Sequence, residues 1–276
     1  MSVLSTGPAP ATEDTDRVVA ELTERALAAR RLIIDMAAGP RGCHLGGSLS
    51  VTDILIAALH RAGQDEATRV VLSKGHAAAA LYAALHVSGV LPENPAPLYA
   101  EPGHHFTGHP NHVLPGVLFP TGSLGHGLPY AAGWALAQRL SGTPGLTVAV
   151  LGDGELQEGL VWEACQVAAA RRLGALTVVV DRNGGQNDGL VADISPLPNL
   201  VERFTAFGFE ATEVDGHNPS ELHAVFRARR DPDGPPLAVV AHTVKGKGVR
   251  AVEGKAGSHY VSIDAAKAAK WKRFVK

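Results

Sequence analysis

The apolar residues of this chain follow two periodicities that alternate along its length. Over residues 15–38 they recur at helical spacing, and the pattern stops at Gly39 and Pro40. Other segments are short, continuous apolar runs such as LTVAVL and LTVVV, which are typical of strands buried on both faces. Together the patterns predict helices over residues 15–38, 50–59 (with Ser50 as N-cap), 77–87, 127–140, 159–172, 200–207 and 220–229, and strands over 69–72, 146–151, 176–181, 209–214 and 237–243.

This alternation predicts an α/β fold in which a parallel sheet is covered by helices on both faces. We find no repeat or linker, so we expect one domain over residues 13–276, preceded by a flexible N-terminal segment at 1–12. Residues 89–122 are rich in proline and glycine and show little periodicity. So long a loop is usually functional or disordered, and in a compact protein we expect it to be ordered.

Charge and cysteine content narrow the class of protein. The formal net charge of −2 gives no electrostatic reason to expect nucleic acid or an anionic membrane as partner. No apolar run reaches the roughly 18 residues of a membrane span, and the first residues lack the features of a signal peptide. Two cysteines, Cys43 and Cys165, make no disulfide framework. We therefore expect a soluble cytoplasmic protein.

An acid and an amide follow two successive predicted strands. GDG (residues 152–154) comes directly after one strand, and DRNG (residues 181–184) ends the next. Because ligands of parallel sheets bind beyond the carboxyl ends of the strands, Asp153 and Asn183 are expected to lie side by side there. One charged and one neutral oxygen suit Mg²⁺ or Ca²⁺, and the glycines let the backbone approach a phosphate. The pattern predicts a divalent metal that holds a diphosphate.

Other interpretations of these polar residues are less favoured. GDGELQ does not match a dinucleotide fingerprint, because Gln157 stands where the third glycine belongs, and it does not match a P-loop. Either Asp153 or Asn183 alone would be an ordinary turn residue. His105, His109 and His112 have a spacing that could ligate zinc, but no cysteine or fourth ligand is near in sequence. A metal–diphosphate site remains the favoured prediction.

Several motifs, in order, resemble the transketolase family over roughly residues 15–260. They are GDGELQEGLVWEA and LGALTVVVDRNGGQNDG, preceded by DMAAGPRGCHLGGSLSVTDIL, VVLSKGHAAAALYAALHVSG, TGHP and TGSLGHGLPYAAG, and followed by AHTVKGKGV and GSHY. A Gly-Asp-Gly followed about thirty residues later by Asn is the thiamine diphosphate signature. The resemblance implies the diphosphate-binding fold of thiamine diphosphate enzymes.

The resemblance also implies roles for individual residues. The metal would be bound by the Asp153 and Asn183 side chains and the Gly185 carbonyl oxygen. Proton transfer to and from substrate hydroxyls would involve His44, His109 and His259. The implied cofactor-binding residues are His76, Gly122, Leu124, Gly152, Asp153, Gly154, Glu155, Asn183, Lys245 and His259. Glu158 and Glu163 match acids near the subunit interface, whereas His126 and Arg182 depart from the family pattern.

The resemblance implies ketol transfer: a two-carbon unit moves from a ketose to an aldehyde, with thiamine diphosphate and Mg²⁺ (or Ca²⁺) as cofactors. The family's pyrimidine-binding domain, with its activating glutamate, has no counterpart in this sequence, so we expect a separate C-terminal subunit to supply it in a two-plus-two heterotetramer. Transketolases bind sugar phosphates through arginines of that other part. The alternatives are the α-type subunit of a 2-oxo acid decarboxylating enzyme and a non-catalytic cofactor-binding protein.

Overall fold

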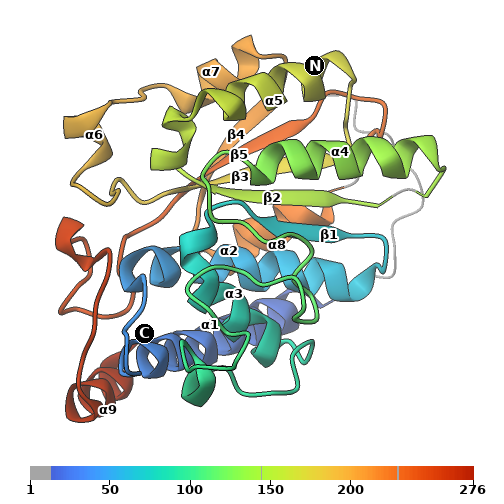
Figure 1. Ribbon diagram of the computed structural model, residues 1–276. Coiled ribbons are helices and arrows are strands. Elements are labelled where there is room, and N and C mark those ends of the chain that lie inside the picture. Colours follow the sequence, from blue (N-terminus) through green and yellow to red (C-terminus); the bar gives the residue numbers. More distant parts are fainter. Residues whose placement is uncertain (1–13, 144, 229) are drawn as a thin grey trace.

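A single five-stranded sheet organises the computed structural model, which describes residues 14–143, 145–228 and 230–276. All neighbouring strands are parallel, and their order is β1-β2-β3-β5-β4 (Figure 1). The strands are β1 (Arg69–Leu72), β2 (Thr147–Gly152), β3 (Leu176–Arg182), β4 (Glu210–Asp215) and β5 (Leu237–His242). The predicted parallel α/β fold is confirmed.

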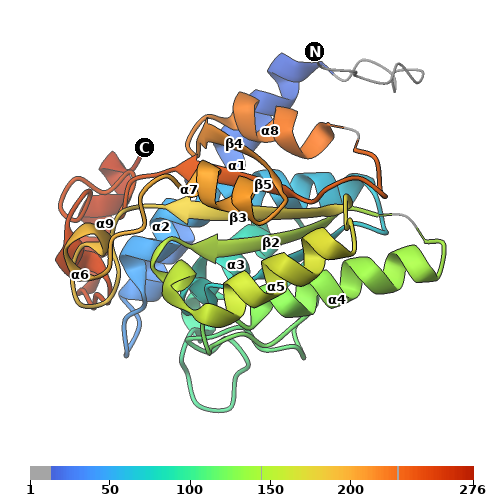
Figure 2. The same ribbon diagram turned by 90° about the horizontal axis from the view of Figure 1, so that it is seen from above.

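Helices cover both faces of the sheet (Figures 1 and 2). One face carries α1 (Thr15–Ala37), α2 (Leu45–Gln64), α3 (Ala78–Val87) and α8 (Pro219–Arg227). The other carries α4 (Gly127–Leu140), α5 (Gly159–Ala170) and α7 (Leu200–Ala206). The short α6 (Val191–Ile194) lies beyond the carboxyl ends of the strands, and α9 (Ala265–Phe274) packs against α1.

The core explains why the central strands read as continuous apolar runs. Every residue of β2 is buried, and successive side chains enter opposite layers. Val148 and Val150 pack with α1, α2 and α3, whereas Ala149 and Leu151 pack with α4 and α5. A strand buried on both faces has no polar side to show in its sequence. Edge strand β4, by contrast, is mostly exposed.

Register brings the ends of three strands level with one another. Gly152 at the end of β2 pairs with Asp181 of β3, and Arg182 pairs with His242 of β5. The GDG turn, the Asn183 turn and the segment that leads to Lys245 therefore leave the sheet at one edge. This is the edge where an α/β sheet binds its ligands.

The start of α2 was predicted wrongly. Helix α2 begins at Leu45 and places Ser50 in its interior, not at its N-cap. Gly46 and Gly47 discouraged a helix in the sequence because glycine has low helix propensity. Here they are needed for contact, since a Cβ on Gly46 would lie 2.4 Å from the Ser258 hydroxyl oxygen. Close packing therefore overrides propensity.

The long loop of residues 89–122 is ordered, as expected, with one 3₁₀ turn at Ala96–Leu98. Buried Tyr99, Phe106, Leu114 and Val117 anchor it to the core. The expected flexible segment at 1–12 lies outside the described residues. Within the described ranges, no helix is both long and apolar enough to cross a membrane, and Cys43 and Cys165 are free and buried.

Candidate active site

Asp153 links the two predicted turns directly. Its carboxylate accepts hydrogen bonds from Gly154 N (2.9 Å), in its own turn, and from Gly184 N (2.7 Å), in the turn after β3. The side chain is 5% exposed. The structure thus places Asp153 beside the Asn183 turn, as strand order predicted.

Asn183 is oriented by buried partners. Its Nδ2 donates to Asp181 Oδ2 (3.1 Å) and to Ser50 Oγ (3.2 Å), while Oδ1 accepts from Gly185 N (3.0 Å). Because the amino group is held by Asp181 and Ser50, the oxygen must be on the opposite side of the amide. Asn183 therefore presents an acceptor, which is what a cation requires.

Beneath this turn lies an ion pair that sequence analysis missed. Lys74 Nζ pairs with Asp181, and both side chains are almost wholly buried. Burial by itself would raise the pKa of Asp181, but the Lys74 ammonium and hydrogen bonds from Lys74, Ser50 and Thr243 hold it below its usual value. Asp181 stays ionised and orients Asn183. In the sequence, the only signal for Asp181 is its position at the end of an apolar strand.

The donor set fits a hard divalent cation. Burial, together with the nearby Asp181 carboxylate, raises the pKa of Asp153 to about 6. A desolvated carboxylate of this kind is stabilised by a bound cation, and oxygen donors suit Mg²⁺ or Ca²⁺. Gly185 packs closely against Lys245, whose Cδ would lie 2.7 Å from a Cβ at that position. A side chain at residue 185 would therefore disturb Lys245.

Four histidine rings converge next to these residues. The ring centroid of His44 lies 5.6 Å from that of His76, 5.8 Å from His109 and 5.3 Å from His259. His76 and His259 are themselves 5.3 Å apart. They come from four separate segments of the chain, so only the fold brings them together. The three histidines predicted for proton transfer are thus assembled in one cluster.

The imidazoles of His44, His76 and His259 are neutral near pH 7. Burial, and then the neighbouring His109, lowers the pKa of His44 to about 4. Burial and Lys245 lower the pKa of His259 to about 4 as well. Burial and Lys74 lower the pKa of His76 further. A neutral imidazole can accept a proton, so the cluster can supply a base.

A cavity of about 360 Å³ joins two of these histidines, His76 and His259, to the two turns. Its lining contains nearly all of the predicted cofactor and metal residues: His76, Gly122, Leu124, Gly152, Asp153, Gly154, Glu155, Asn183, Gly185 and His259. It also contains Lys74, Gln157, Gln186 and Asp188, which the sequence analysis did not assign to the site. Five separate segments of the chain therefore line a common space.

Lys245 lies beside this cavity and is held there by a second buried network. Its Nζ donates to Gln186 O (3.0 Å). The adjacent Val244 N donates to His217 Nε2 (2.9 Å), and His217 Nδ1 bonds Asp53 Oδ2 (2.7 Å). Since Nε2 accepts, Nδ1 carries the proton. Asp53 also pairs with buried Arg30. This network fixes the segment that delivers Lys245.

Four other residues singled out from the sequence are partly or fully exposed. Arg182, which departs from the family pattern, pairs with Glu213 of the edge strand β4 (3.9 Å). His126 is exposed at the start of α4. Glu163 is exposed, and Glu158, also exposed, belongs to the lining of the 360 Å³ cavity. Among the described residues, no group of three His, Cys, Asp or Glu side chains is placed so that it could hold a metal ion.

Comparisons with known proteins agree with this geometry. Residues 23–275 match the family model described as transketolase, thiamine diphosphate binding domain. A 6-deoxy-6-sulfo-D-fructose transketolase subunit from Clostridium sp. (strain MSTE9) is 37% identical over 229 residues, which are 80% of this chain and 83% of that protein. An apulose-4-phosphate transketolase subunit from Actinobacillus succinogenes is 36% identical over 87% of this chain and 90% of its own.

Solved structures give the same result. Transketolase from Campylobacter jejuni superposes with a TM-score of 0.79 at 30% identity, over 93% of this chain and 43% of that one. Transketolase from Leishmania mexicana gives 0.77 at 26% identity, over 91% of this chain and 41% of its own. The chain thus spans less than half of these transketolases, and nearly all of the subunits named above. It belongs to the transketolase family and carries that family's thiamine diphosphate-binding domain.

Proposed function

We propose that this chain works with a separate partner subunit to transfer a two-carbon ketol unit from a ketose to an aldehyde, using thiamine diphosphate and Mg²⁺. The observation that carries the proposal is the cluster of four histidines, beside a cavity whose other wall holds Asp153 and Asn183. A decarboxylating enzyme has no substrate hydroxyl to deprotonate, so a cluster of bases favours ketol transfer.

The residues divide the work in this proposal. Asp153, Asn183 and the Gly185 carbonyl hold the metal, while the backbone of the GDG turn and Lys245 hold the diphosphate. When bound, thiamine diphosphate supplies the stabilised carbanion that carbon–carbon cleavage needs. His44, with His109 and His259, takes the proton from the ketose C3 hydroxyl and returns one to the aldehyde oxygen.

The partner and its stoichiometry also belong to the proposal. Two relatives of nearly the same length are named as transketolase subunits, which supports a separate second subunit. We propose that the partner supplies the pyrimidine-binding domain and the activating glutamate, in a two-plus-two heterotetramer. Buried, free Cys43 and Cys165 suit a reducing cytoplasm, where we place the enzyme.

Asp153→Ala tests the metal and cofactor assignment. In the reconstituted enzyme we expect Mg²⁺-dependent thiamine diphosphate binding to be lost, because a methyl group cannot replace an anionic ligand. Asn183→Ala should weaken it too. Titration calorimetry measures the affinity, and product analysis with ketose and 2-oxo acid donors measures the reaction. Wild-type affinity in both variants would refute the site, and decarboxylation of 2-oxo acids without ketol transfer would refute the reaction.

A further inference from the structure

A second cavity, of about 460 Å³, adjoins the histidine cluster through His44. His44 is the one member of the cluster of four that lines it. His76 and His259 line the 360 Å³ cavity described above, which we name the cofactor cavity. The remaining lining includes Arg41, Tyr99, Glu101, His104 and Tyr260. The His44 ring, which also contacts Tyr260 (centroids 4.9 Å apart), therefore stands between the two spaces. We name the second space the Arg41 pocket.

The backbone that carries Arg41 is firmly held. Tyr260 Oη donates to Arg41 O at 2.6 Å. Cys43 and Val261 exchange two backbone hydrogen bonds, of 3.1 and 2.9 Å. Gly42 has φ of +68°, and a Cβ there would lie 2.5 Å from Val261 O, so this turn requires glycine. Arg41 is thus mounted on a fixed turn at the rim of the pocket.

The Arg41 guanidinium has no partner within the described part of the chain. Among the described residues, its side chain makes no hydrogen bond or ion pair, and no carboxylate lies within salt-bridge distance. Glu101, the acid in the lining, is not paired with it. A guanidinium with free N–H groups in a concave site is well suited to bind a phosphate or sulfonate in a bidentate manner.

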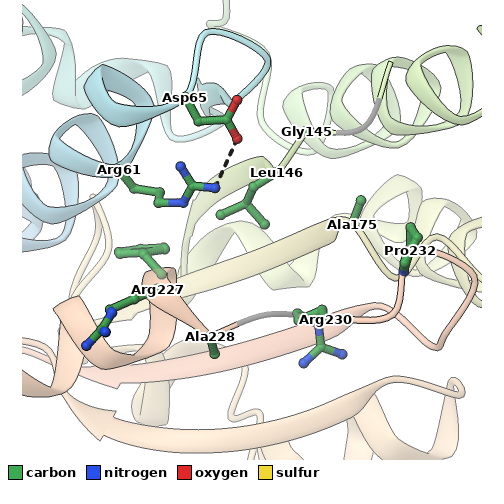
Figure 3. Close-up of a pocket in the computed structure, with 10 residues that line it drawn as sticks. Arg61, Asp65, Gly145, Leu146, Ala175, Arg227, Ala228, Arg230 and Pro232 are labelled. Atoms are coloured by element: carbon green, nitrogen blue, oxygen red, sulfur yellow. Dashed lines mark hydrogen bonds and ion pairs between the residues drawn. The ribbon is translucent and has the colours of Figure 1, made fainter. Parts of the chain in front are cut away.

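A cavity with more arginines serves as a contrast (Figure 3). It lies at the amino ends of the strands and is lined by Arg61, Arg227 and Arg230. Two of these charges are already matched, since Arg61 pairs with Asp65 (2.9 Å) and Arg230 pairs with Glu210 (3.0 Å). No residue of the histidine cluster lines it. The Arg41 pocket is the better candidate for a substrate site because it adjoins His44, although it contains fewer arginines.

We propose that the Arg41 pocket binds the terminal oxyanion, phosphate or sulfonate, of the sugar substrate. This rests on the proposed function: with the reacting carbons between the cofactor cavity and His44, the rest of the sugar chain extends past His44 into this pocket. Arg41 then binds the terminal group, while Glu101 and the Tyr99 hydroxyl are available to sugar hydroxyls. The Tyr260 hydroxyl donates to Arg41 O and can only accept from the sugar. The chain therefore contributes to substrate choice and does not leave it wholly to the partner.

Direct binding tests this without turnover. The full chain is titrated with fructose 6-phosphate, 6-deoxy-6-sulfofructose and fructose, and binding is followed by NMR chemical shifts. The wild type should bind the two anionic sugars more tightly than fructose, and the tighter of the two identifies the terminal group. Arg41→Gln should weaken anionic binding about 10- to 100-fold, the effect of losing a charged hydrogen-bond pair. The matched control Arg227→Gln, in the cavity of Figure 3, should bind all three sugars with wild-type affinity.

Two results would refute the proposed role of the Arg41 pocket. One is a wild type that binds the anionic sugars no more tightly than fructose, and the other is an equal affinity of Arg41→Gln and the wild type for the anionic sugars. Turnover of the reconstituted enzyme separates this from the proposed function. Suppose that ketol transfer occurs but Arg41→Gln leaves the ratio of kcat/KM for phosphorylated and unphosphorylated donors unchanged. The assignment of the Arg41 pocket to the terminal oxyanion is then refuted, and the proposed function is not. If no sugar supports transfer but anion binding still depends on Arg41, the proposed ketol-transfer reaction is refuted. The proposal that the Arg41 pocket binds an oxyanion is then retained.

Discussion

The protonation state of His44 determines whether it can act as a base. With a pKa lowered to about 4 by burial and by His109, the free enzyme should hold it neutral at every pH from 5.5 to 8. Because kcat/KM reports ionisations of the free enzyme, its profile should show no acid limb near 6.5, the value of an ordinary histidine. Rates of the reconstituted enzyme measured over this range give the answer.

His44→Ala should lower turnover by roughly 10²-fold or more, the range for loss of a positioned acid–base group. Its effect on cofactor affinity should be much smaller than that of Asp153→Ala, since His44 does not line the cofactor cavity. His112→Ala, on the exposed part of the same loop as His109, is the matched control. Undiminished transfer by His44→Ala, or a kcat/KM that falls with a pKa near 6.5, would contradict the assigned role.

The residues that could be predicted from sequence are those with a local signal. Asp153 and Asn183 each follow a predicted strand, and the parallel fold then places them at one edge. The Lys74–Asp181 pair and Ser50 gave no such signal. Ser50 is 131 residues from Asp181, and only tertiary packing makes them hydrogen-bond partners. Arg41 likewise could not be singled out from the sequence, because only the fold shows that it shares a pocket with His44.

At the scale of elements, the Glu155 carboxylate joins three segments. It accepts hydrogen bonds from Gly125 N (2.9 Å) before α4, from Gly152 N (3.1 Å) at the end of β2, and from Ser73 Oγ after β1. From the resemblance, Glu155 was expected only as a cofactor-binding residue. Its side chain, 2% exposed, holds the loop with Gly122 and Leu124 against the GDG turn.

Glu155→Gln should therefore loosen the cofactor cavity. An amide NH₂ must face either Gly125 N or Gly152 N, and a donor facing a donor leaves a buried group unsatisfied, at a cost of about 1–3 kcal/mol. We expect a lower free energy of unfolding in urea and weaker thiamine diphosphate binding. Glu66→Gln, at an exposed position, removes the same charge without these partners. Equal losses in both variants would show that charge alone, and not the contact, matters.

Element boundaries show where sequence information ends. Helix 127–140 was predicted to the residue, because its apolar pattern ends at a polar segment on each side. The start of α2 was missed by five residues, because Gly46 and Gly47 are explained by contacts with Ser258, Lys74 and His76. Those contacts come from remote parts of the chain. Boundaries are predictable where the local pattern decides them, and less so where packing does.

For the whole molecule, we propose that helices α4 and α5 form part of the interface with the partner subunit. The two helices lie side by side on one face of the sheet (Figure 2). Gly133, Ala137 and Leu140 of α4 are exposed in one row, with Leu140 78% exposed. On α5, Glu163 and Val167 are exposed, the latter at 54%. A small, apolar row of this kind allows close approach of a second subunit.

Ala137→Glu tests whether the partner covers this row. A single exposed substitution changes the free energy of unfolding by about 0.5 kcal/mol or less, so the isolated chain should melt as the wild type does. In a complex, however, the same glutamate would be buried without a partner charge, and assembly should weaken strongly. Ala20→Glu, at an exposed site on α1 across the sheet, is the matched control and should assemble normally. Light scattering with and without the partner subunit measures both, and a normal molar mass for Ala137→Glu would place the interface elsewhere.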